Sequence, residues 1–179
     1  MEDLSLHILD IAENSVNAGA KNIEITIKTD KENDLLILEI IDDGQGMEKE
    51  FAANAADPFQ TKRTTRKVGL GLAFLDEATK QTEGKLTVDS SKGIGTKIRA
   101  TFKLSHIDTK PVGDIAETLV MLIAGNPEID IRYNHFLYGS KFIFDTKDIR
   151  ESYPTLQINS VNVLGFIRKF IRENINIKK

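Results

Sequence analysis

Apolar side chains recur at helical spacing along residues 3–18 and at every second position along residues 22–28 and 35–41. The first spacing predicts an amphipathic helix that ends at Gly19, and the second predicts two strands with one buried face each. Three further elements are expected in this part of the chain: helices at 48–56 and 70–82, and a strand hairpin at 85–89 and 96–104. We therefore expect an α+β fold, a two-layer sandwich with helices on one face of a mixed, mostly antiparallel sheet.

A second, shorter set of elements follows. The pattern predicts a helix at 113–124, strands at 129–133 and 141–144, and two C-terminal helices. Asp145 or Thr146 would cap the first of these two helices, and Ser160 the second. The expected division is one domain at residues 1–106 and a small C-terminal α/β extension at 107–179, to which the sequence assigns no role.

Composition narrows the class of protein. The chain has 179 residues and a mass of 20.0 kDa, with 40% apolar and 28% charged residues, which suits one sizeable core. It has no cysteine, which excludes disulfides, thiol catalysis and cysteine-held metal sites, and its three histidines are scattered. A net charge of −3 gives no attraction to nucleic acid, and no apolar run approaches membrane-spanning length. The acidic first residues are unlike a signal peptide, so we expect a cytoplasmic protein without nucleic-acid or membrane partners.

Three glycine pairs stand beside expected helix or strand ends. They are Gly44 and Gly46, Gly69 and Gly71, and Gly93 and Gly95. No Lys-Ser or Lys-Thr follows any of them at P-loop spacing. Lys49 stands where a dinucleotide fingerprint needs its third glycine, and Ala53 stands where a calcium loop needs glutamate. A single pair is usually a plain turn, whereas three pairs indicate a shared site.

Strand alternation places two polar side chains on the buried face, at strand ends. Asp42 continues the parity of the apolar residues in 35–41, and Thr96 begins the apolar face of 96–104. A buried carboxylate is unfavourable unless it finds a hydrogen-bond donor. An adenine amino group would be such a donor, with Thr96 helping to hold the carboxylate. The alternative is that both residues cap turns at the rim of the sheet.

Four polar residues share one face of the first helix, namely His7, Asp10, Asn14 and Asn17. Such a stripe is usually the solvent-facing side of a helix. The alternative is a face for metal and phosphate, on which Asn14 offers a hard oxygen to Mg²⁺ and Asp10 orients or deprotonates a water.

A basic stretch without apolar residues precedes the second glycine pair. Residues 60–67 contain four bases, among them Lys62, and lead into Gly69, Leu70 and Gly71 at a helix start. Free backbone N–H groups at a helix start favour phosphate. The stretch is therefore either an ordinary solvated loop or a basic lid over a phosphate group.

Together, and in this order across residues 4–104, these segments resemble the boxes of the GHKL superfamily. That superfamily is the ATP-binding domain of gyrase, heat-shock chaperones, histidine kinases and the mismatch-repair protein MutL. Residues 10–20 resemble its N box, and their sequence pattern Glu-Asn-Ser-x-x-Ala-Gly-Ala is closest to that of MutL. Residues 57–62 resemble the F box of histidine kinases. The segments that resemble its glycine boxes are 42–47, 69–72 and 93–96.

The resemblance implies the Bergerat ATP-binding fold with a site for ATP and Mg²⁺. Asn14 would be the magnesium ligand, and Asp42 would accept a hydrogen bond from the adenine amino group. The other residues that the resemblance places at the nucleotide are Asn17, Gly44, Gly46, Met47, Lys62, Gly69, Leu70, Gly71, Leu72 and Thr96.

Two departures from the family pattern bear on the reaction. Many hydrolysing members have glutamate at the position of Asp10, and histidine kinases often have asparagine there. Asp10 is therefore a candidate general base that leaves hydrolysis and phosphotransfer open. Only a few residues precede the N box, so no phosphoacceptor helix pair is expected before it, and 107–179 are too short for a transducer domain.

The expectation is a stand-alone catalytic subunit that binds Mg·ATP and phosphorylates a partner protein, as anti-sigma serine kinases of this superfamily do. One alternative is an ATP-hydrolysing conformational or dimerisation switch of the MutL type, and another is a nucleotide sensor without turnover. Each hypothesis allows a homodimer.

Overall fold

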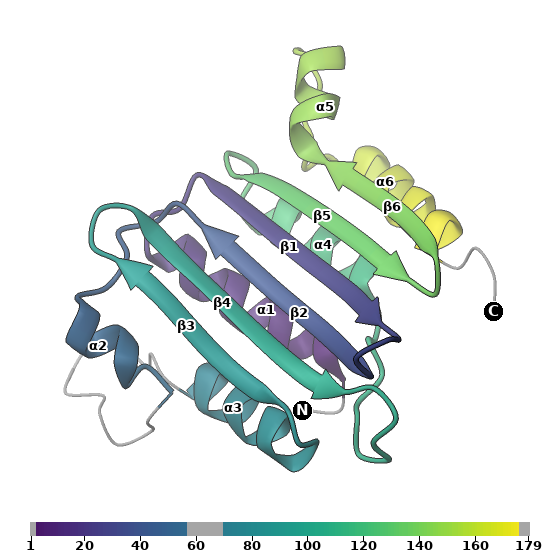
Figure 1. Ribbon diagram of the computed structural model, residues 1–179. Helices are drawn as coiled ribbons and strands as arrows, with labels where there is room; N and C mark the ends of the chain where they lie inside the picture. The colour runs from purple at the N-terminus through teal and green to yellow at the C-terminus, as the bar shows by residue number, and fades with distance from the viewer. Residues whose placement is uncertain (1–2, 57–69, 176–179) are drawn as a thin grey trace.

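The computed structural model of the chain describes residues 3–56 and 70–175. Helices lie on one face of a six-stranded sheet, and the other face of the sheet is open (Figure 1). In chain order the elements are α1 (Leu4–Asn17), β1 (Asn22–Asp30), β2 (Leu35–Asp42), α2 (Lys49–Ala53), α3 (Leu70–Gln81), β3 (Lys85–Ser91), β4 (Gly95–Lys103), α4 (Ile115–Gly125), β5 (Asp130–Leu137), β6 (Ser140–Asp145), α5 (Thr146–Ser152) and α6 (Val161–Ile175).

Helix α1 begins at a capped residue and buries one continuous face. The side chain of Asp3 accepts a hydrogen bond of 3.2 Å from the N–H of Leu6, which satisfies one of the free amides of the first turn. Leu4, Ile8 and Ile11 follow at helical spacing, and none is more than 1% exposed. The amphipathic helix predicted from the spacing is confirmed, and its apolar face belongs to the main core.

The strands lie in the order β3-β4-β2-β1-β5-β6. Among the described strands, β1 and β5 are parallel neighbours, and the other four pairs are antiparallel. Residues of one parity, such as Ile25, Ile40 and Ile98, lie opposite one another and face the helices. The prediction of helices on one face of a mixed, mostly antiparallel sheet is therefore confirmed.

Residues 107–175 extend this sheet. Strand β5 lies beside β1, with Tyr133 opposite Ile25, and β6 forms the outer edge (Figure 1). Helix α4 packs against both α1 and α6, and its Leu119 belongs to the same hydrophobic cluster as Ile8. Of the two predicted caps of α5, Asp145 is the one used, since its carboxylate accepts a hydrogen bond from the N–H of Lys147.

No helix within 3–56 or 70–175 is both long enough and apolar enough to cross a lipid bilayer.

Candidate functional site

The carboxylate of Asp42 is buried at the end of β2, and two donors hold it. Asp42 is 8% exposed, as the strand alternation predicted. The hydroxyl of Ser15 on α1 donates to Oδ2 at 2.6 Å, and the N–H of Gly44 donates to Oδ1 at 2.9 Å. These bonds offset the loss of water around the carboxylate and fix its orientation. The helix-side lone pairs that remain can accept a donor from a ligand.

Thr96 lies directly opposite Asp42 in the ladder between β2 and β4, but its hydroxyl bonds elsewhere. It lies 2.9 Å from the hydroxyl of Ser90, which itself donates to the carbonyl of Gly95 at 3.0 Å. Because a serine hydroxyl has one proton, Thr96 is the donor in this pair. The expectation that Thr96 helps to hold the Asp42 carboxylate is therefore wrong in this structure, where Ser15 has that role.

Ser90 also accepts a hydrogen bond of 2.8 Å from the N–H of Met47. With Thr96 as its second donor, Ser90 joins the first glycine segment to the third. Neither Ser90 nor Ser15 was predicted as a site residue: Ser15 lies within the segment that resembles the N box, but its spacing marked it as part of the apolar helix face, and Ser90 belongs to no motif. Strand parity was the available signal for Ser90, which shares the buried face with Thr96.

The two glycine loops touch through their backbones, and this contact requires glycine at two positions. A Cβ atom at Gly46 would lie 2.0 Å from the carbonyl oxygen of Ser91, and one at Gly95 would lie 2.0 Å from that of Asp42. Gly46 also has φ +60 and Gly95 φ +134, which side-chain-bearing residues rarely adopt. The glycines therefore serve first to bring the loops together beside Asp42.

A second aspartate ties the loop to the sheet. The carboxylate of Asp43 accepts hydrogen bonds from the N–H of Lys21 at 2.7 Å and of Asn22 at 2.8 Å, and from the Asn22 side chain at 2.6 Å. Burial by itself would raise the pKa of Asp43, but these hydrogen bonds outweigh it and hold the pKa below its ordinary value. Asp43 is a positioning residue that the sequence analysis did not single out.

The polar stripe on α1 divides into a buried and an accessible part. His7 is 1% exposed and its ring nitrogens have no hydrogen-bond partner among the described residues, so this residue belongs to the core and not to a solvent face. Burial, followed by the charge of Lys110, lowers the pKa of His7 to about 4. Asp10 and Asn14 are half-buried, and Asn17 is exposed at the helix end.

The start of α3 lies against Asp10. A Cβ atom at Gly71 would stand 2.8 Å from Oδ2 of Asp10, so a side chain at this position would displace the Asp10 carboxylate. Gly71 and Leu72 are buried, while Leu70 is exposed. Lys62 and Gly69, with the rest of the predicted F box and basic lid at 57–69, lie outside the described residues.

The donor chemistry of this corner suits Mg²⁺. Asn14 presents an amide with no hydrogen-bond partner in the described ranges, and Asp10 stands one helical turn before it. Amide and carboxylate oxygens are hard ligands, and magnesium keeps most of its waters. The chemistry of these residues therefore fits a magnesium ion that Asn14 would hold through its amide oxygen.

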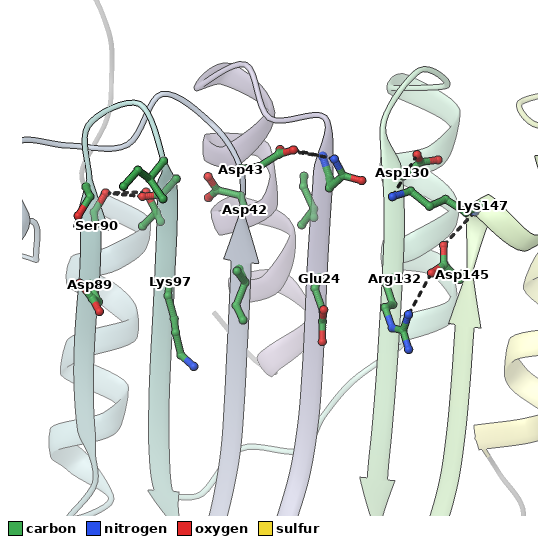
Figure 2. Close-up of a pocket in the computed structure, with 17 residues that line it drawn as sticks. Glu24, Asp42, Asp43, Asp89, Ser90, Lys97, Asp130, Arg132, Asp145 and Lys147 are labelled. Carbon is green, nitrogen blue, oxygen red and sulfur yellow. Dashed lines mark hydrogen bonds and ion pairs between the residues drawn. The ribbon is translucent and has the colours of Figure 1, made fainter.

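A cavity of about 610 Å³ opens at the same strand ends, but mainly on the open face of the sheet (Figure 2). Asp42 and Thr96 line it, whereas Asp10 and Asn14 do not. Five of its charged residues are cross-strand neighbours of opposite sign, in two groups: Asp89 and Lys97 on β3 and β4, and Glu24, Arg132 and Asp145 on β1, β5 and β6. Opposite charges in such cross-strand positions are typical of a solvated sheet face.

The two-layer fold and the buried, hydrogen-bonded carboxylate agree with the nucleotide-binding domain that the sequence predicted. The sequence profile of the family "Histidine kinase-, DNA gyrase B-, and HSP90-like ATPase" matches residues 2–106, and the chain belongs to this family. ATP binding follows from that membership.

Three relatives show the extent of the similarity, and two of them are named as histidine kinases. The chain is 30% identical over 116 residues to the Non-motile and phage-resistance protein of Caulobacter vibrioides, covering 60% of this chain and 14% of that protein. It is 32% identical over 108 residues to the Histidine protein kinase SaeS of Staphylococcus epidermidis, covering 58% and 30%. It is 31% identical over 94 residues to the Sensor histidine kinase YvrG of Bacillus subtilis, covering 50% and 16%. The matched region is thus a minor part of each relative.

Proposed function

We propose that this protein binds Mg·ATP and transfers the γ-phosphoryl group to a separate partner protein in the cytoplasm. In this proposal residues 1–106 form the nucleotide-binding unit, and 107–179 form an extension with a role of its own. The transfer breaks the bond between Pγ and the β–γ bridging oxygen, forms a bond to the acceptor side chain, and leaves ADP.

The observation that favours a separate acceptor is the setting of the three histidines. His7 and His135 are buried, and their rings are not accessible to a phosphate group. His106 is half-buried in the turn after β4, where its Nδ1 accepts a hydrogen bond from the N–H of Asp108 at 3.2 Å. Two of the named relatives are histidine kinases, so an acceptor outside this chain would account for the same chemistry here.

The residues on the helix side divide the task. Asp42, held by Ser15 and Gly44, would accept the adenine amino hydrogen bond and set the orientation of the base. Asn14 would hold the magnesium ion through its amide oxygen. The bound ion would neutralise phosphate charge. Asp10 would receive the proton that the acceptor loses, since it lies beside the start of α3 and one helical turn before Asn14.

A second candidate, an ATP-hydrolysing conformational switch, is favoured by the carboxylate at position 10. The contact of Asp10 with Gly71 places it beside the helix start that binds phosphate in this family, where it would serve equally as a base for water. In both reactions Asp10 would act as the general base. Hydrolysis and transfer then differ only in the nucleophile that Asp10 deprotonates, which is water in the first and the acceptor side chain in the second.

Purified protein incubated with γ-labelled ATP separates these functions. If the protein transfers phosphate, little free phosphate and no self-labelling are expected. A partner protein is first captured on this protein in the presence of a non-hydrolysable ATP analogue, and it should become labelled when it is then incubated with this protein and the labelled ATP. Steady phosphate release without any partner supports the switch, and release that Asp10→Asn lowers about 100-fold or more would assign the base. The matched control is Glu13→Gln, an exposed carboxylate on the same helix. Nucleotide binding with neither release nor label in any captured protein leaves a sensor and overturns the kinase proposal.

A further inference from the structure

Strand β6 is the outer edge of the sheet, and no described strand lies on its far side. Its sequence is Ser-Lys-Phe-Ile-Phe-Asp, without proline. Such an edge presents unpaired N–H and C=O groups that another strand can join, and natural proteins usually cover or break it. The edge of β6 is therefore a candidate interaction surface.

The charges of β6 are arranged so that the strand complements itself. Lys141, Ile143 and Asp145 point to the open face, with the apolar residue midway between a base and an acid. In an antiparallel pair of two copies, opposite residues share a face. The register centred on Ile143 places each Lys141 opposite the other copy's Asp145, whereas shifting the centre to Phe142 or Phe144 sets one of these charges against Ile143 and removes both pairs.

Both charged groups are available to such a pair. Lys141 is exposed and makes no ion pair within the described ranges; its Nζ lies 6.0 Å from the ring centroid of Phe136. The carboxylate of Asp145 is held in place by the N–H of Lys147 at 2.9 Å and by Arg132 at 3.5 Å. A carboxylate accepts about four hydrogen bonds, so it can bind a further ammonium group.

An apolar surface adjoins the same edge on the helix side. Helix α6 runs alongside β6 (Figure 1), and Phe142 of β6 contacts Phe170 with ring centroids 5.8 Å apart. Phe170 stacks on Phe166 at 6.2 Å, and Phe166 is 68% exposed. Two copies joined through β6 would bring these phenylalanines together across the twofold axis and remove them from water.

We propose that two copies of this chain pair antiparallel through β6, in the register centred on Ile143, to form a continuous sheet across a symmetric dimer. The helices α6 of the two copies then pack beside each other through Phe166 and Phe170. This interface is separate from the nucleotide site at the end of β2, so it does not depend on the proposed phosphotransfer.

The absence of cysteine from the chain permits a direct test of the register. In Ile143→Cys the two thiols stand directly opposite each other at the axis. Opposite residues of an antiparallel pair have Cα atoms about 4.5–5.5 Å apart, within the range that a disulfide spans. Mild oxidation is expected to convert most of this variant to a covalent dimer. The matched control is Ile107→Cys, which is 94% exposed in the loop after β4 and is expected to stay monomeric on the same denaturing gel.

A second measurement does not depend on cross-linking. Sedimentation velocity of the wild-type chain over a concentration series should show a dimer whose dissociation constant rises with salt. Lys141→Glu places like charges opposite at two symmetric positions and should raise that constant about tenfold or more, while Lys85→Glu on the far edge strand should not. Unchanged circular dichroism and ATP affinity would show that both variants are folded.

The proposal is overturned if the wild-type chain is monomeric at the highest soluble concentration. This holds even if a different protein binds the edge of β6. It is also overturned by a dimer that tolerates Lys141→Glu while Ile143→Cys cross-links no faster than Ile107→Cys, since the contact then lies elsewhere.

Discussion

Ser15 and Asp42 are joined side chain to side chain at 2.6 Å, although they stand 27 positions apart in the chain. The bond connects the last turn of α1 to the end of β2 and is buried. It shows that the carboxylate expected to meet adenine is already oriented by the helix that carries Asp10 and Asn14. The hydrogen bond thus joins the two elements that carry the predicted nucleotide site.

Removing this hydroxyl should cost stability. Ser15→Ala leaves a buried carboxylate with one donor fewer, so we expect the free energy of unfolding to fall by about 1–3 kcal/mol. Urea denaturation followed by circular dichroism measures the change. Ser91→Ala, an exposed serine whose hydroxyl has no hydrogen-bond partner in the described part of the chain, should stay within about 0.5 kcal/mol of wild type. Equal losses in the two variants would mean that the bond is not stabilising.

Asp42→Asn should abolish adenine recognition without unfolding the protein. The substitution is nearly isosteric, but an amide nitrogen can turn towards the adenine amino group and leave a donor unpaired, at a cost of about 1–3 kcal/mol, or roughly five- to 150-fold in affinity. Titration with a fluorescent ATP analogue measures it, with Asp89→Asn on the open sheet face as the control. Binding as tight as wild type would remove Asp42 from the adenine site.

Asn14→Ala should weaken ATP binding chiefly in the presence of magnesium. The lost oxygen is a metal ligand in our proposal, so ADP without metal should bind almost equally to the variant and to wild type. Isothermal titration with and without Mg²⁺ separates the two cases. A loss of the same size in both conditions would identify Asn14 as a structural residue.

Gly46→Ala should be strongly destabilising, since its Cβ atom would meet the carbonyl oxygen of Ser91 at 2.0 Å. The loops must then separate, and we expect a loss of about 2 kcal/mol or more together with weaker nucleotide binding. Gly125→Ala at the end of α4 has open space and an ordinary backbone, so it should be neutral or slightly stabilising. Thermal melts of the two variants provide the comparison.

His7 should make the protein less stable in acid. Its pKa is about 4 in the folded protein and 6.5 in the unfolded chain, so the unfolded state binds the proton first as the pH falls. The free energy of unfolding should therefore decrease between about pH 6.5 and pH 4, by up to about 1.4 kcal/mol per pH unit from this group.

His7→Leu removes the titrating group and the two unpaired ring nitrogens. The difference in the free energy of unfolding between the variant and wild type should favour the variant more at pH 5 than at pH 8. Urea titrations at the two pH values measure this difference. A difference that is independent of pH would place the origin of any acid sensitivity in other residues.

The local sequence pattern was sufficient to predict most of the secondary structure and the family. Asp3 caps α1, the alternation in residues 35–41 sets which side chains of β2 are buried, and Asp145 caps α5, because each depends on neighbours within a few positions. The order of the glycine segments likewise needs no tertiary structure, since a motif is a property of the chain.

Tertiary packing decided what depends on distant residues. The parallel pairing of β5 with β1 joins segments about a hundred positions apart, and no local period encodes which strands become neighbours. The same applies to Ser15, whose spacing marked it only as part of the apolar helix face until β2 brought Asp42 against it. Periodicity also grouped His7 with Asp10 and Asn14, but α4 and the segment before it bury one end of that stripe and leave the other accessible. The period of a helix places residues on the same face along its whole length. Which of these residues are buried depends on the elements that pack against each turn, and the period does not encode them.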